Sequence, residues 1–166
     1  MHRLIIAVLR AGIAAAILLG LFGQIVVIPT TASDEVERFP PYEPFAVPYA
    51  TVAILGVACV QVVLGAVWML LDMVERDAVF TRRAFRWVDT VIGATAVATL
   101  LALGVACHLA VAEIPAAPDD DMQLLGALGA AVACVGAGAA FALLVVVMRG
   151  LLSKATALRS ELAEVV

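Results

Sequence analysis

Residues 69–91 read MLLDMVERDAVFTRRAFRWVDTV and join two long apolar runs through a short polar segment that changes from acidic to basic. Thr81 is a good helix N-cap, which predicts a helix that begins at Arg82 and continues straight into the following apolar run. Phe85 and Trp87 lie beside the arginines. This mixture is typical of a segment with its rings at the acyl boundary and its guanidinium groups at lipid phosphates. The chain is therefore expected to turn at a membrane face here.

Outward from this turn, most of the chain belongs to four apolar runs, at residues 4–28, 49–71, 88–112 and 122–148. Each run is long enough to cross a hydrocarbon core of about 30 Å at about 1.5 Å per residue. Hydrophobic residues make up 64% of the 166 residues and charged residues only 14%, which is outside the range of soluble domains. The sequence predicts an all-α integral membrane protein, a single domain that forms a four-helix transmembrane bundle over residues 1–166.

Basic residues crowd alternate polar segments. Nine of the ten Lys and Arg residues lie at the start of the chain, in the linker 72–87 or in the tail 149–166: Arg3, Arg10, Arg76, Arg82, Arg83, Arg86, Arg149, Lys154 and Arg159. The positive-inside rule then predicts that both termini and the linker are cytoplasmic. Residues 29–48 and 113–121 become the outer loops. Their acidic character argues against nucleic-acid binding on that side.

The first run could be either a membrane span or a signal peptide that is cleaved off. Thr30 and Ala32 loosely resemble a signal-peptide cleavage site, but the apolar stretch is far longer than a signal-peptide core of about 7–15 residues. We therefore expect it to remain as a span, with Arg10 reaching the inner headgroups. The five prolines in residues 29–48 forbid a continuous helix there, so we expect an irregular loop.

Polar side chains within the spans are few, and none of the span centres carries a charge. The candidates for an intramembrane polar role are Gln24, Gln61, Thr95, Thr99 and His108. The two glutamines are suited to hydrogen bonds across helices. The two threonines, one turn apart, either join such a network or bond back to their own helix carbonyls.

Charged residues at the span ends have structural explanations. Asp72 and Asp89 flank the arginine-rich linker, and we expect them to pair with it. The sequence has no nucleophile elbow, no Walker A loop, no zincin motif and no cluster of metal ligands. The three cysteines fall in three different runs, without a CxxC pair. We therefore expect no enzyme activity, no cofactor and no metal.

Small residues recur every four positions in the fourth run: Gly126, Ala130, Cys134, Gly138 and Ala142. Similar rows occur in the first and third runs. Such faces allow helix backbones to approach closely in lipid. They hold this bundle together or build a homo-oligomer, and the sequence leaves both alternatives open.

The tail RGLLSKATALRSELAEVV follows the fourth run. Leu151, Ala155, Leu158, Leu162 and Val165 recur at helical spacing, and charged residues occupy the rest of the helical wheel. This pattern predicts a cytoplasmic amphipathic C-terminal helix. It could lie on the membrane, pack against the linker, or dock a soluble partner.

The four spans, the linker AVFTRRAFRWVDTVIG and the tail MRGLLSKATALRSELAEVV together make the chain resemble the bacterial membrane family called domain of unknown function 2975, and its actinobacterial branch in particular. The resemblance covers nearly the whole chain. It implies a multi-pass protein of the bacterial cytoplasmic (inner) membrane without an assigned activity. Members are often encoded beside a small helix-turn-helix regulator, which implies a cytoplasmic regulatory partner. The tail departs from the family at Glu164, Val165 and Val166, where many relatives are more acidic.

Three hypotheses of function follow. The first is a non-enzymatic scaffold or sensor that docks a cytoplasmic partner through Arg82, Arg83, Arg86, Leu151, Leu158 and Leu162. The second is a small transporter or channel with a polar path lined by Gln61, Thr95, Thr99 and Cys134, although the chain lacks the membrane-buried glutamate of the small multidrug exporters. The third, an enzyme, needs His108 and Glu113 to meet Tyr42 or Asp34.

Overall fold

A computed structural model describes residues 2–75, 82–112 and 121–164. Residues 2–38 form one uninterrupted helical segment, which comprises α1 (His2–Phe22), the π-helical turn η1 (Gly23–Val27) and α2 (Ile28–Arg38). A short 3-10 turn, η2 (Pro40–Tyr42), leads into α3 (Glu43–Glu75). The remaining helices are α4 (Arg82–Val111) and α5 (Asp121–Glu164). No strand occurs in these three described ranges.

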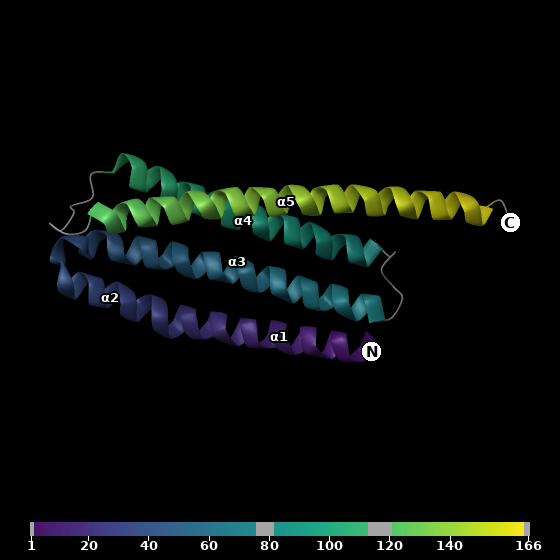
Figure 1. Cartoon of the computed structure of the whole chain (residues 1–166), viewed down its shortest axis with the longest axis horizontal. Coiled ribbons are helices and arrows are strands. Elements are labelled where there is room, and N and C mark those ends of the chain that lie inside the picture. The colour runs from purple at the N-terminus through teal and green to yellow at the C-terminus, as the bar shows by residue number, and fades with distance from the viewer. Residues whose placement is uncertain (1, 76–81, 113–120, 165–166) are drawn as a thin grey trace.

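Four helical segments are long and apolar enough to cross a membrane, over Leu4–Arg38, Pro40–Glu75, Arg83–Val111 and Leu125–Ala155. The prediction of an all-α protein with four transmembrane helices is therefore confirmed. The beginning and the end of the chain lie at the same end of the molecule (Figure 1). We call this the terminal end and the other the loop end.

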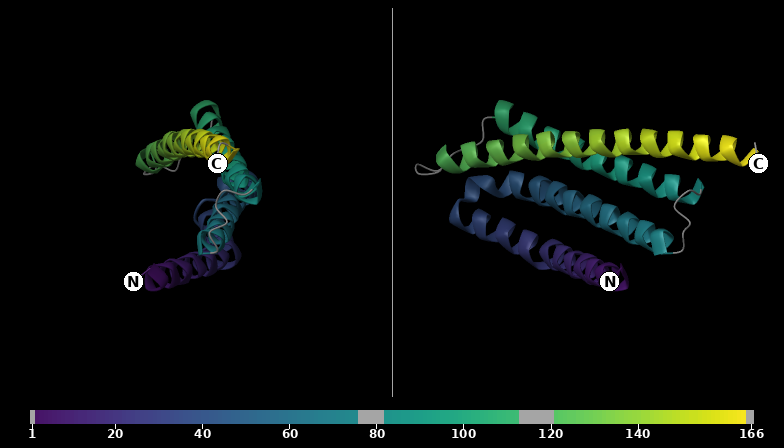
Figure 2. Two further views of the ribbon diagram at one scale, coloured as in Figure 1. Left: turned by 90° about the vertical axis from the view of Figure 1, so that its right-hand side faces the viewer. Right: turned by 45° about the vertical axis from the view of Figure 1, so that its right-hand side comes forward.

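The four long helices are arranged in chain order, each against its neighbour. α1 and α2 pack on α3, α3 packs on α4, and α4 packs on α5. Within the described ranges, α1 does not contact α4 or α5, and α3 does not contact α5. Viewed from the end, the bundle is an open arc with α1 at one tip and α5 at the other (Figure 2).

Few side chains are buried in this arc, because each helix meets at most two neighbours. The buried residues are Ile6, Ile13, Ala66, Met73, Ala84, Val91, Thr95, Ala106 and Ala131. Three pairs of them, on α1, α3 and α4, are spaced seven residues apart. A seven-residue repeat keeps the same face turned toward a neighbouring helix that crosses at a small angle. Most of the large aliphatic side chains are exposed, so lipid would cover them.

The prediction of an irregular loop over residues 29–48 is wrong for most of that range. The helix breaks only at Phe39, whose backbone is extended with φ −139° and ψ 90°. Pro44 lies in the first turn of α3, where a backbone N–H has no partner within its helix to lose. Pro29 instead follows the π-helical turn η1 within the continuous 2–38 segment, where the regular ladder of backbone hydrogen bonds is already interrupted. Pro48 lies in the interior of α3.

The tail does not form a separate helix. α5 continues without interruption from Asp121 to Glu164, so its 44 residues span about 66 Å. Its C-terminal part extends past the other helices at the terminal end (Figure 1). Gly150 alone does not stop it, because Leu, Ala, Lys, Arg and Glu dominate the following residues and all favour helix. A helix is present from Arg82 onward, as predicted, and the predicted N-cap, Thr81, lies outside the described residues.

The face of α5 that packs on α4 differs from the predicted row of small residues. The less exposed positions are Leu128, Ala131, Val135, Gly138, Ala142 and Val145, whereas Gly126, Ala130 and Cys134 are exposed. Four residues advance a helix by about 40° beyond a full turn, so a row at intervals of four winds off the contact face. Positions that are spaced alternately by three and four residues stay on the contact face.

Gly138 is required for the close approach of α4 and α5, because a Cβ at this position would collide with the Thr99 hydroxyl. We predict that Gly138→Val destabilises the α4–α5 packing by about 1–3 kcal/mol, the usual cost of overpacking. Gly136→Val is the matched control, since a Cβ there meets nothing within 4 Å. Thermal unfolding in non-ionic detergent, followed by circular dichroism, measures both. Equal losses of stability in the two variants would contradict the prediction.

Candidate functional site

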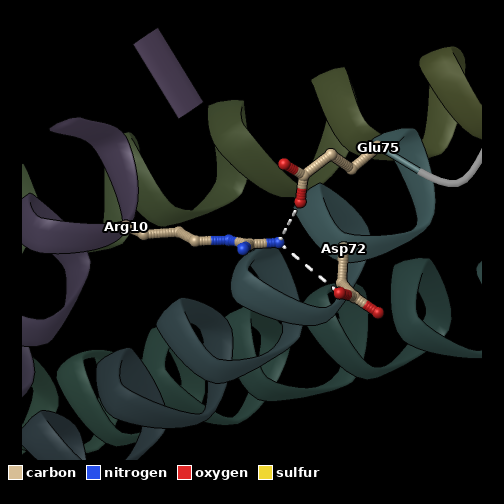
Figure 3. A network of polar contacts seen from close by, with 3 residues as sticks. All are labelled: Arg10, Asp72 and Glu75. Carbon is tan, nitrogen blue, oxygen red and sulfur yellow. Dashed lines mark hydrogen bonds and ion pairs between the residues drawn. The ribbon is translucent and has the colours of Figure 1, made fainter. Parts of the chain in front are cut away.

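The clearest polar cluster joins α1 to α3 near the terminal end. The terminal nitrogen Nη2 of Arg10 lies 2.8 Å from Oε2 of Glu75 and 3.5 Å from Oδ1 of Asp72 (Figure 3). The guanidinium also lies over the ring of Trp68, at 5.9 Å from its centroid. With only 28% of its side chain exposed, Arg10 is turned toward α3. Its position about two turns inside α1 therefore has an explanation besides contact with the headgroups.

Two glutamines extend this contact toward the loop end. The side-chain amide of Gln24, in η1, donates to the carbonyl oxygen of Ile54 at 3.0 Å. In the opposite direction, Gln61 on α3 donates to the carbonyl oxygen of Ile17 at 3.5 Å. Gly20 leaves room for the second bond, because a Cβ there would lie 2.9 Å from Nε2 of Gln61. Each helix thus donates one amide to the backbone of the other.

These contacts share one register. Positions 10, 17 and 24 on the first segment are spaced seven residues apart, and so are positions 68, 61 and 54 on α3, which they face in that order. We call this row of three contacts the polar seam. It runs along the antiparallel pair from the Arg10 cluster to the π-helical turn.

The threonines of α4 do not join the polar seam. Thr95 and Thr99 each donate to the carbonyl oxygen four residues earlier in their own helix, both at 2.8 Å. Thr95 is buried, and the side chain of Thr99 lies against Gly138 of α5. Gln61 therefore belongs to the α1–α3 contact and Thr99 to the α4–α5 contact, while Cys134 is exposed. The four residues considered for a polar path do not converge on one site.

His108 lies near the end of α4 at the loop end and meets α3. Its Nδ1 is 2.7 Å from the hydroxyl of Tyr49, and the rings of Phe45 and Tyr49 approach it edge-on. Of the partners considered for His108, Glu113 lies outside the described residues. The observed aromatic partners of His108 are Phe45 and Tyr49.

A second ion pair joins α4 to α5. Arg149 Nε lies 2.7 Å from Oδ1 of Asp89, and both side chains are about half exposed, at 46% and 48%. Asp89 is thus paired with the fourth span, whereas we had expected a linker arginine. Arg83 and Arg86 are exposed at the start of α4.

The remaining predicted docking residues lie on α4 and α5. Arg82 begins α4, but its side chain is outside the described part, as are the side chains of Leu158 and Leu162. Leu151 is 58% exposed. Among the residues searched, no three His, Cys, Asp or Glu side chains gather as metal ligands would.

Comparison with known proteins yields one family. A family model described as Protein of unknown function (DUF2975) matches residues 30–166. No curated protein and no solved structure matches the chain. The matched range contains α3, α4, α5 and nearly all of α2, and α1 precedes it.

The half-exposed Asp89–Arg149 pair tests how strongly a charge contact of this kind joins two helices. We predict a coupling energy below about 1 kcal/mol in a double-mutant cycle of Asp89→Asn and Arg149→Gln, because solvent screens exposed pairs. The coupling should weaken as salt is raised. Thermal unfolding in non-ionic detergent at low and high salt provides the measurement, with Lys154→Gln as a matched loss of charge on α5. A coupling of several kcal/mol would refute this estimate.

Proposed function

This chain belongs to the family described as Protein of unknown function (DUF2975), and from that premise we propose that it is a non-enzymatic membrane scaffold or sensor that docks a cytoplasmic regulatory protein. The docking surface is the exposed basic start of α4 together with the projecting C-terminal part of α5. A small helix-turn-helix regulator is the class of partner that the family resemblance favours. In this role the protein itself does not contact nucleic acid.

The continuous length of α5 is the observation that carries this proposal. Beyond the Asp89–Arg149 pair the helix has 15 further residues, Gly150–Glu164, which extend about 22 Å. An isolated helix of this length is marginal in water and gains most from an apolar face that packs on something. Leu151, Leu158 and Leu162 lie within one narrow face by their spacing. That face suits the groove of a partner helix or domain.

The exposed arginines supply the second part of the surface. Arg83 and Arg86 lie in the first turns of α4, which packs on α5. Arg149 is held by Asp89 at the same end of these helices. A basic rim around an apolar strip suits a partner with an acidic edge and also anionic lipid headgroups.

The orientation of the protein follows from its charges. All nine basic residues other than Arg38 fall in the segments assigned to the terminal end, so we place this end in the cytoplasm and the protein in the bacterial inner membrane. The proposed surface then faces the compartment that holds soluble regulators.

The transporter hypothesis has less support. It needs Gln61, Thr95, Thr99 and Cys134 to line one path, whereas Gln61 contacts α1, Thr99 contacts α5 and Cys134 is exposed. In the described part of the chain, Gln61 and the two threonines bond to different backbone carbonyls and not to one another. We therefore favour docking.

The orientation can be tested with a single thiol. In a background with Cys59, Cys107 and Cys134 replaced by Ala, Ser160→Cys should resist a membrane-impermeant maleimide in intact cells, because a cytoplasmic tail is shielded by the bilayer. The same site should react after the cells are permeabilised. Asp34→Cys, on α2, is the complementary control and should react without permeabilisation. Labelling of residue 160 from outside would show that the assignment is reversed.

The docking surface can be tested by photocrosslinking in cells. With p-benzoylphenylalanine at Leu151, we predict a discrete adduct with a soluble protein that mass spectrometry identifies. Leu158→Asp with Leu162→Asp should reduce this adduct at least tenfold, because burying two carboxylates in an apolar contact is strongly unfavourable. Ser160→Asp places the same charge on the opposite face and should leave the adduct intact. Adducts with lipid or with this protein alone would remove the docking proposal.

A further inference from the structure

The first segment is attached differently from the other helices. α1 contacts α3, but in the described ranges it does not reach α4 or α5. In lipid, two apolar faces gain little by leaving the acyl chains for each other, so polar contacts and close fit decide whether a helix stays in place. The polar seam is therefore the main specific attachment of α1.

The two ends of the polar seam are unequal. At the loop end, the chain itself continues from Gln24 through α2, which also packs on α3, so this end is restrained on both sides of the glutamine. At the terminal end the restraint is the Arg10 cluster. Both carboxylate contacts are made by the same nitrogen of Arg10, Nη2. The Nε of Arg10 is buried without a hydrogen-bond acceptor.

The loop end of the polar seam coincides with a local irregularity in the helix. The turn η1, which contains Gln24, has the wider π-helical hydrogen-bonding pattern, and Pro29 is the second residue after it. A proline and a π-bulge are both established causes of a bend in a long helix, since both interrupt the regular ladder of backbone hydrogen bonds. Figure 2 shows the ribbon changing direction between α1 and α2.

We infer that α1 is a hinged arm, which pivots at η1 and is latched against the end of α3 by the ion pairs of Arg10 with Glu75 and Asp72. The latch carboxylates occupy the last turn of α3, immediately before the segment that leads to the basic start of α4. Release of the arm would remove the contact of α1 from this last turn. The inference stands without the docking proposal, because it concerns contacts within one chain.

Two distances measured by electron spin resonance in the full-length, membrane-reconstituted protein test the hinge. In the background without cysteines, spin labels at Val8 and Val74 report the latched end, and labels at Ile25 and Val47 report the loop end. All four side chains are exposed. In protein that keeps Arg10, Asp72 and Glu75, each of the two pairs of spin labels should give one narrow distance distribution.

Removing the latch should affect one end only. We expect Arg10→Gln to shift the Val8–Val74 distribution to longer distances while the Ile25–Val47 distance stays unchanged. Arg38→Gln is the matched control, since that arginine is 79% exposed and its contact with Glu35 is within its own helix. It should leave both distances unchanged.

Asp72→Asn with Glu75→Gln removes the latch from the other side and should reproduce the Arg10→Gln result. This double variant also serves if Arg10→Gln fails to accumulate. An unchanged Val8–Val74 distance would overturn the latch, and so would equal broadening at both ends, which indicates general loosening. If Arg10→Gln broadens the Val8–Val74 distribution and the double carboxylate variant does not, the contact of Arg10 with Trp68 restrains α1. That result would also overturn the ion-pair latch.

Discussion

Lipid chains and leucine side chains are equally apolar. A transmembrane helix therefore gains little hydrophobic free energy when it exchanges contacts with lipid for contacts with another helix. The arrangement of these four helices depends on that constraint. Their contacts rest on close fit, as where Gly138 admits Thr99, and on a small number of polar contacts such as the polar seam. Because few residues are buried between the helices, a single polar contact is a large share of the interactions between two neighbours.

The polar contacts also divide the molecule into two parts of different character. The α3–α4–α5 part has fitted faces of small and medium side chains, with the Asp89–Arg149 ion pair and the Tyr49–His108 contact near the helix ends. The contact of α1 with α3 instead carries an arginine and two glutamines along its length. The family match at residues 30–166 begins after α1. The family pattern and the packing thus place their boundary close to the same point in the chain.

Features that depend on local chemistry could be predicted from the sequence. The four apolar runs follow from composition, which involves neighbouring residues. The effect of a proline depends on its position within a helix: Pro44 falls in the first turn of α3, and Pro29 follows the π-helical turn η1. Arg10 was expected at the headgroups, and Asp89 beside the linker. Their partners, Glu75 and Arg149, are 60 or more residues away, so they could not be identified before the order of the helices was known.

The open arc has a consequence for biogenesis. Because every contact between long helices in the described ranges joins consecutive spans, each span can associate with the one before it as soon as it leaves the translocation channel. No later helix has to be inserted between two that have already met. The order in which the ribosome delivers the spans is thus also the order in which they can assemble.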